Sequence, residues 1–258
     1  MTDRAPVERV PLSEWNAESL RATVFPSADA EVSPSSWWRN VLGDEPETQV
    51  IQSRTGQRQE QGTFHGARLR LQIQPARIDW TLSPILSDAE PPQGFPAVGN
   101  FEKLCQQFRE LMLRWLPFSP LADRIAFGAT TLLPIASRAD GYRRLSAYLP
   151  AVKLDADNSS DFQYRINRPR PSKAQIERLR INRLSTWTVI MLDLRTVILG
   201  AREEPRVLTV EPIFACRVEL DINTSAQFEG KLNPSQSEKL LDEMMDLAKK
   251  ILESGDHP

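Results

Sequence analysis

The chain has 258 residues, of which 40 % are hydrophobic and 26 % are charged, a composition typical of an ordinary globular protein. Its formal net charge of −2 gives no general attraction to nucleic acid or to an anionic membrane, so binding to either would require a local basic patch. No stretch approaches the run of about 18 apolar residues that a membrane span needs, and the N-terminal region lacks the apolar core of a signal peptide. We therefore expect a cytoplasmic protein that does not enter a membrane.

The first predicted elements are a polar start and a short helix. We expect a flexible tail over residues 1–11. The stretch 33–43, SPSSWWRNVLG, predicts a helix because a serine and a proline precede its apolar part and Gly43 follows it. The adjacent Trp37 and Trp38 project about 100° apart on such a helix. We expect one indole to face the core and the other to cover a neighbouring element or lie exposed, which makes the pair a candidate protein-interaction site.

Between residues 48 and 83 the hydrophobic pattern changes to a period of two, which is typical of strands. In the clearest case Leu69, Leu71 and Ile73 alternate with arginines and glutamines, so one face of that strand is expected to be buried and the other wet. Three strands are predicted here, and the short connections between them favour antiparallel pairing. The proline-rich stretch 83–99 is expected to be an exposed connection.

Two long amphipathic helices are predicted farther along the chain. Asn100 can cap a helix over residues 100–116, in which apolar residues recur every three or four positions. Asn233 can cap a second helix over residues 234–253, with Gln236 in capping-box position.

The segments between these helices return to the strand pattern. The first such strand, over residues 123–134, contains Gly128, which suggests a β-bulge. A short helix is expected near residues 140–149, followed by further strands within 161–168, 178–199 and 207–223.

Runs of strands separated by helices predict an α+β fold with a mainly antiparallel sheet. We expect a single compact unit over residues 1–258. The two long helices share matching residues at a constant offset of 136, from Glu102 and Glu238 onward, which raises the alternative of two similar β-rich halves. Those halves would cover residues 12–134 and 138–255, each with its long helix.

Few residues in the chain suggest catalysis. The only two histidines are His65 and His257, and the sequence contains no nucleophile motif and no phosphate-binding loop. Cys105 and Cys216 lie far apart without nearby metal ligands, so we expect two buried thiols. The sequence therefore predicts no catalytic residue, no metal and no cofactor, and an enzyme is the less favoured reading.

One pair of carboxylates keeps a hydrolase among the hypotheses. Glu219 and Asp221 share one face of a predicted strand with Asn223, and two carboxylates at that spacing could hold a magnesium ion in a nuclease. The basic residue that such sites usually add nearby is missing from this strand. We therefore interpret the three residues as an exposed strand face, with a metal-dependent nuclease or hydrolase as the third hypothesis.

The most suggestive segment runs from Tyr164 to Trp187 and repeats the tetrapeptide Arg-Ile-Asn-Arg. Strand alternation predicts a basic stripe of Arg165, Arg178 and Arg180 on a wet sheet face. The flanking aromatic residues could stack on bases if they were exposed. The alternative is a solvated sheet face neutralised by acids on a neighbouring strand. The residues predicted to bind an anion or nucleic acid are Arg165, Arg168, Arg170, Lys173, Arg178 and Arg180.

These observations favour a non-catalytic binding protein, as a protein-interaction subunit of a larger cytoplasmic assembly of bacterial type. The first alternative is a component that binds nucleic acid or another polyanion through the basic sheet face. We expect a protein partner, and a homo-oligomer stays open. The sequence does not identify the partner.

Overall fold

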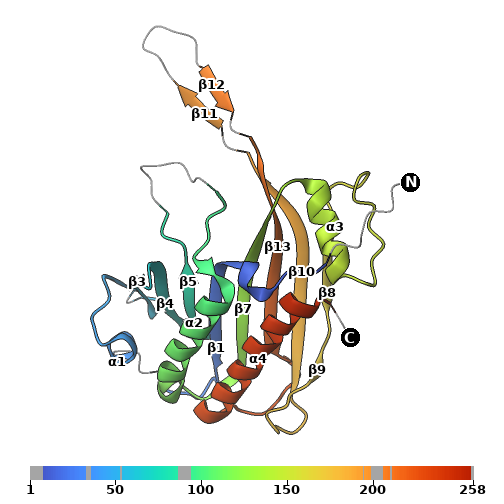
Figure 1. Ribbon diagram of the computed structural model, residues 1–258. Coiled ribbons are helices and arrows are strands. Elements are labelled where there is room, and N and C mark those ends of the chain that lie inside the picture. Colours follow the sequence, from blue (N-terminus) through green and yellow to red (C-terminus); the bar gives the residue numbers. More distant parts are fainter. Residues whose placement is uncertain are drawn as a thin grey trace.

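The computed structural model describes residues 8–32, 36–52, 54–86, 94–193, 195–198, 206–209 and 211–256. Within this part of the chain, a large antiparallel sheet packs against four α-helices (Figure 1). The predicted α+β fold with a mainly antiparallel sheet is confirmed. No helix in the described ranges is both long enough and apolar enough to cross a membrane.

The large sheet has the strand order β2-β3-β4-β5-β1-β7-β13-β10-β8, with β6 paired to β1 and β9 paired to β10. Each of its strand pairs is antiparallel. A separate hairpin of β11 and β12 projects from the end of β10 and β13 (Figure 1). The strands are β1 (Asn16–Pro26), β2 (Thr48–Gln52), β3 (Gln57–Phe64), β4 (Ala67–Gln74), β5 (Arg77–Ser83), β6 (Gly99–Asn100), β7 (Ala122–Ile135), β8 (Gln163–Asn167), β9 (Arg170–Pro171), β10 (Arg180–Leu192), β11 (Arg195–Ile198), β12 (Arg206–Thr209) and β13 (Ile213–Thr224).

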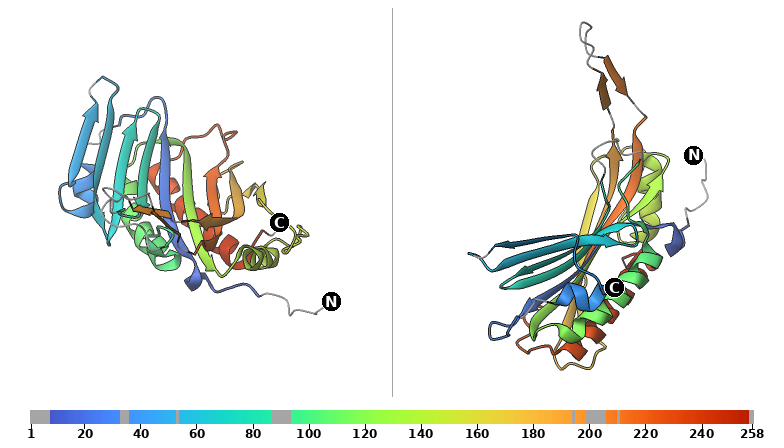
Figure 2. Two further views of the ribbon diagram at one scale, coloured as in Figure 1. Left: turned by 90° about the horizontal axis from the view of Figure 1, so that it is seen from above. Right: turned by 90° about the vertical axis from the view of Figure 1, so that its left-hand side faces the viewer.

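The helices all lie on one face of the sheet (Figure 2). They are α1 (Trp37–Leu42), α2 (Phe101–Trp115), α3 (Arg138–Tyr148) and α4 (Pro234–Ser254), with short 3-10 turns at η1 (Leu12–Glu14) and η2 (Leu116–Phe118). The two long helices α2 and α4 occur where the periodicity predicts them. The predicted caps are also present: the Asn100 side chain accepts from the backbone N–H of Lys103, and Asn233 and Gln236 form a capping box.

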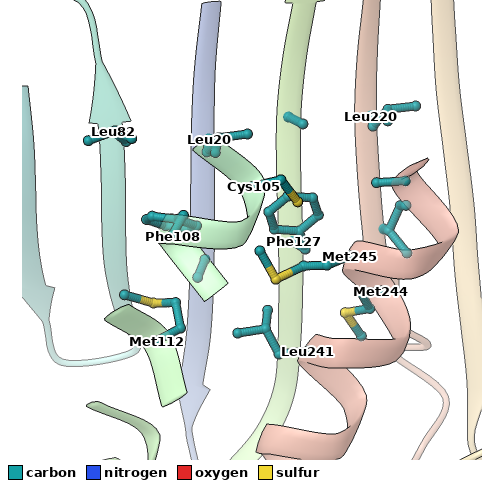
Figure 3. Close-up of a cluster of buried hydrophobic side chains, with 14 of the residues drawn as sticks. Leu20, Leu82, Cys105, Phe108, Met112, Phe127, Leu220, Leu241, Met244 and Met245 are labelled. Atoms are coloured by element: carbon teal, nitrogen blue, oxygen red, sulfur yellow. The ribbon is translucent and has the colours of Figure 1, made fainter. Parts of the chain in front are cut away.

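The core fills the layer between the helices and the sheet. Figure 3 shows side chains from four central strands meeting side chains from α2 and α4. Because side chains alternate across a strand, each strand that sends one row of side chains into this layer sends its other row to the opposite face of the sheet. The labelled residues are Leu20, Leu82, Phe127 and Leu220 from the sheet, and Cys105, Phe108, Met112, Leu241, Met244 and Met245 from the helices.

Both indoles of α1 belong to this core. Trp37 makes an edge contact with Trp115 of α2, and Trp38 stacks on Trp80 of β5. Each is 4 % exposed. The helix buries both side chains because its partners are themselves large aromatic residues on α2 and β5. Neither indole is the exposed side chain that a protein-interaction site on this helix would need.

Two local predictions, the flexible tail and the bulge at Gly128, differ from the structure. Of the tail predicted over residues 1–11, residues 1–7 lie outside the described part of the chain. Arg9 and Val10 are hydrogen-bonded to Ala147 and Tyr148 at the end of α3. Gly128 marks no bulge, because β7 stays in regular register with β1 and β13 around it.

Candidate functional site

No helix of the described residues covers the face of the sheet opposite the helices, and we call it the open face. A hollow of about 560 Å³ lies over its centre, across β1, β5, β7, β8, β10 and β13. Its lining is mainly hydroxyl, guanidinium and carboxylate groups. The lining residues include Ser19, Arg21, Thr81, Gly128, Thr130, Arg165, Thr186, Glu219 and Asp221.

One row of directly opposed residues crosses the middle of the open face. Arg70 of β4 is opposite Thr81 of β5, and Thr81 is opposite Arg21 of β1. Arg21 is in turn opposite Gly128 of β7, which is opposite Asp221 of β13. Directly opposed residues of an antiparallel sheet share a face, so two arginines flank one threonine near the centre of the sheet.

Gly128 makes room for one of these arginines. A Cβ atom at this position would lie 3.3 Å from Nη2 and 3.5 Å from Nε of Arg21, so the guanidinium rests directly over the glycine. The Arg21 side chain thus extends from β1 across β7, in the direction of β13. The structural role of Gly128 is close approach of a neighbouring side chain rather than a distorted strand.

Within the described ranges, the Nε atoms of Arg21 and Arg70 have no hydrogen-bond partner. Both Nε atoms are buried. Buried polar groups are nearly always paired in folded proteins, and an unpaired one costs roughly 1–3 kcal/mol. Arg68 and Arg165 also lie on the open face without an ion-pair partner among the described residues, since the salt bridges of this face involve other side chains.

The acids of the open face are mostly engaged by their own neighbours. Asp79 forms an ion pair with Arg77 and accepts a hydrogen bond from the Thr23 hydroxyl at 2.6 Å. Glu219 forms an ion pair with Arg217, and Asp221 accepts a hydrogen bond from Asn223 at 3.1 Å. The expected neutralisation of Arg165 by Glu219 and Asp221 does not occur, because Thr186 lies between Arg165 and Glu219 in the sheet.

The three residues of the predicted basic stripe do not lie together. Arg165 is on the open face, opposite Thr186. Arg180 is six residues from Thr186 along β10, which is about 20 Å in an extended strand. Arg178 precedes β10 in a turn with φ of 61°, exposed beside Glu177. The stripe is therefore absent because the strand begins two residues later than the alternation suggests.

Three more of the predicted binding residues instead attach this segment to α4. Arg168 donates two hydrogen bonds to Asp256, at 2.6 and 2.9 Å, and Arg170 donates one to Glu243 at 2.6 Å. The backbone N–H of Lys173 also donates to Glu243. We call this set of contacts the α4 clamp.

The hydrogen bonds of the α4 clamp lower the pKa of both of its carboxylates. Burial alone would raise the pKa of Asp256, but the hydrogen bonds from Arg168 and Tyr164 outweigh it and lower the pKa below the ordinary value. Burial likewise opposes ionisation of Glu243, and the donors from Ser172, Lys173 and Arg170 bring its pKa below the ordinary value. The clamp therefore holds two ionised carboxylates, each neutralised by an arginine.

Neither aromatic residue of the segment can stack on a base. Trp187 is fully buried, and the hydroxyl of Tyr164 donates a hydrogen bond to Asp256 at 2.9 Å on the helix-bearing side of the sheet. The two cysteines are also buried, and burial raises the pKa of each thiol to about 12. No three His, Cys, Asp or Glu side chains within the described ranges are placed to hold a metal ion.

Sequence reasoning missed the two arginines that the structure brings to the centre of the open face. The alternation around Leu69 and Leu71 already places Arg68 and Arg70 on a wet face, so that signal was present. Arg21 had a similar signal, because Leu20, Ala22 and Val24 alternate with Arg21 and Thr23, but the predicted strands do not include this segment. In comparisons with protein-family models, curated proteins and solved structures, no match to this chain was found.

Proposed function

We propose that this protein is a non-catalytic binding protein whose open face binds an acidic segment of a protein partner. The observation that carries the proposal is the pair Arg21 and Arg70, which flank Thr81 with buried and unpaired Nε atoms. An acidic ligand would pair with the terminal Nη groups of these two guanidiniums, since the Nε atoms themselves are buried. Arginine suits this role because its planar guanidinium can donate two parallel hydrogen bonds to one carboxylate.

The surroundings of the arginines suit a carboxylate-bearing protein segment. Hydroxyl groups of Ser19, Thr81 and Thr130 line the hollow and can donate to or accept from a peptide backbone. Beyond the hollow, β4 and β3 continue the open face with polar side chains, so an extended segment could cross the face.

A nucleic acid fits the same face less well. Proteins that bind single strands without sequence preference rely on exposed aromatic rings as stacking platforms. Here the indoles of the described chain lie in the core, including Trp80 and Trp187 of the sheet strands. Phe25 lies on the open-face side of β1, but the guanidinium groups of Arg77 and Arg124 already cover its ring.

The test is a binding titration with a defined acidic probe. Fluorescence anisotropy of a fluorescein-labelled oligoglutamate peptide should report binding that weakens as salt is added. We expect Arg21→Ala and Arg70→Ala each to weaken binding by about tenfold, the equivalent of losing one charge-assisted contact of about 1.4 kcal/mol. Gly128→Val should weaken it similarly without changing charge, because the added side chain displaces the Arg21 guanidinium.

Arg178→Ala is the matched control. It removes the same charge from an exposed turn outside the open face, so it should leave the peptide affinity unchanged. Equal losses in Arg21→Ala and Arg178→Ala would mean that only net charge matters and would contradict the proposal. Tighter binding of a labelled single-stranded oligonucleotide, weakened by the same open-face variants, would favour the nucleic-acid alternative instead.

A further inference from the structure

The strand β2 forms a bare edge of the large sheet. It pairs with β3 on one side, and no described strand pairs with it on the other. All five of its residues are exposed, and the side chains of Val50 and Ile51 are 53 % and 57 % exposed. Because Val50 points to the open face and Ile51 to the helix-bearing face, the edge is apolar on both sides.

Natural sheets usually protect such an edge with charges, prolines or bulges. The sequence of β2, TQVIQ, contains none of these devices. The opposite edge does have one, because β8 carries Arg165 in its middle. An unprotected strand with free backbone N–H and C=O groups is suited to pair with another strand.

Charged residues on either side of β2 indicate that the strand that pairs with it is a second copy of β2. Asp44, Glu45 and Glu47 precede it, and Arg54 follows it. Glu45 is ion-paired with Arg39, and Glu47 accepts a hydrogen bond from the backbone N–H of Thr63. Arg54 is exposed and has no ion-pair partner among the described residues, and the same holds for Asp44. Antiparallel pairing of β2 with a second β2 would bring the acidic end of each copy beside the basic end of the other.

We propose that two copies of this chain associate through β2, antiparallel, so that their sheets become one continuous sheet. A two-fold axis perpendicular to the sheet keeps each face on the same side in both copies. Open-face residues must then meet open-face residues, and the register centred on the midpoint of the strand places Val50 opposite Val50 of the second copy. Gln49 then meets Ile51, and Thr48 meets Gln52.

This arrangement would put both open faces on one side of the dimer. It does not depend on what the open face binds. If the open face binds an acidic segment, the dimer would hold two such sites in one plane and could bind a partner with two segments more tightly than a single copy could.

Sedimentation velocity of the full chain over a wide concentration range tests the association. The contact is small, so we expect a monomer–dimer equilibrium rather than a permanent dimer. Val50→Lys should abolish the dimer, because it would place two lysines directly opposite each other. Phe118→Lys is the matched control, since Phe118 is 51 % exposed on η2, away from β2, and this variant should still dimerise.

Single cysteines test the register. With Val50→Cys the two Cα atoms would lie about 4.5–5.5 Å apart, within disulfide range, so mild oxidation should give a covalent dimer. With Thr48→Cys the two cysteines would be about 13 Å apart and should not link. The natural cysteines do not interfere, because both are buried.

Three results would overturn the proposal. The first is a wild-type chain that stays monomeric at the highest concentration at which it is soluble. The second is a Val50→Lys variant that still forms the dimer. The third is equal disulfide yield from the cysteines at positions 48 and 50, which would indicate random collision. Circular dichroism spectra matching the wild type would show that the variants fold.

Discussion

At the scale of single residues, Asp256 shows how one carboxylate can hold the C-terminal end of a chain in place. Its side chain is 5 % exposed, and it accepts hydrogen bonds from Arg168 and Tyr164. Its own backbone N–H donates to the carbonyl of Tyr148. Gly255 permits this approach, because it adopts φ of 82° and a Cβ there would lie 2.1 Å from that carbonyl oxygen.

We predict that Asp256→Asn lowers the free energy of unfolding at neutral pH by about 2–3 kcal/mol, since it leaves the partly buried Arg168 guanidinium without its counter-charge. The effect should depend on pH. The folded pKa of Asp256 lies below the unfolded value of about 3.9, so its ionisation stabilises the fold above that value and the contribution is lost as the pH falls through the folded pKa. Urea unfolding at a series of pH values measures this.

The matched control is Glu229→Gln, which removes a negative charge from an exposed residue outside the α4 clamp. Its unfolding free energy should equal that of the wild type throughout the series. A difference between Asp256→Asn and the wild type that stays constant below pH 4 would show that the ion pair is not the cause.

At the scale of elements, the α4 clamp changes the meaning of the basic segment. Arg168 binds Asp256, just after the end of α4, and Arg170 binds Glu243 in the middle of α4, whereas Arg178 lies in an exposed turn. Residues of one type, close in sequence, thus have different roles because their partners differ. The acids that decide those roles are 88 and 73 residues away along the chain.

We predict that Arg170→Ala lowers the free energy of unfolding by roughly 1–2 kcal/mol, because a buried charge-assisted hydrogen bond is lost while Ser172 and Lys173 still donate to Glu243. Arg178→Ala, an equal change in charge on an exposed side chain, should have no measurable effect. Chemical denaturation of both variants decides this. Equal stability of the two would mean that the clamp contributes nothing.

The long helices could be predicted because their signals are local. Apolar periodicity and capping residues lie within the helix itself, as at Asn100 and Asn233. The open-face site could be predicted only in part. Its arginines come from β1, β4 and β8, and their proximity depends on strand order, which no short stretch of sequence encodes. Arg70 and Arg21 meet around Thr81 only because β5 lies between β4 and β1.

At the scale of the whole molecule, the first and second parts of the chain place their strands in the sheet by a similar pattern. The first part of the chain contains, among other elements, β1, a short helix, the β3–β4–β5 meander and α2, in that order. The second part contains β7, α3, the strands β8, β10 and β13, and α4. In each part the last long strand pairs with the first, and the two first strands, β1 and β7, pair with each other. Two similar halves, over residues 12–134 and 138–255, stay a prediction.

Several contacts join the two parts. β1 and β7 pair along most of their length, Arg109 of α2 donates two hydrogen bonds of 2.6 Å to Asp242 of α4, and Arg217 of β13 bonds Glu18 of β1 at 2.7 Å. The buried side chains of both parts also form one continuous hydrophobic cluster. Unfolding one part alone would expose the β1–β7 edge and the core surface of the other, so partial unfolding should be costly.

We therefore predict a single cooperative unfolding transition. The two natural cysteines can report on the parts separately, because Cys105 lies in α2 and Cys216 in β13, and both are buried. Each thiol should react with an alkylating reagent only when its own part opens. Brief labelling across a urea series, with the modified peptides quantified by mass spectrometry, should give the same midpoint for both cysteines and for circular dichroism. A lower midpoint for Cys216 than for Cys105 would show instead that the second part opens alone, and that the β1–β7 pairing does not couple the two.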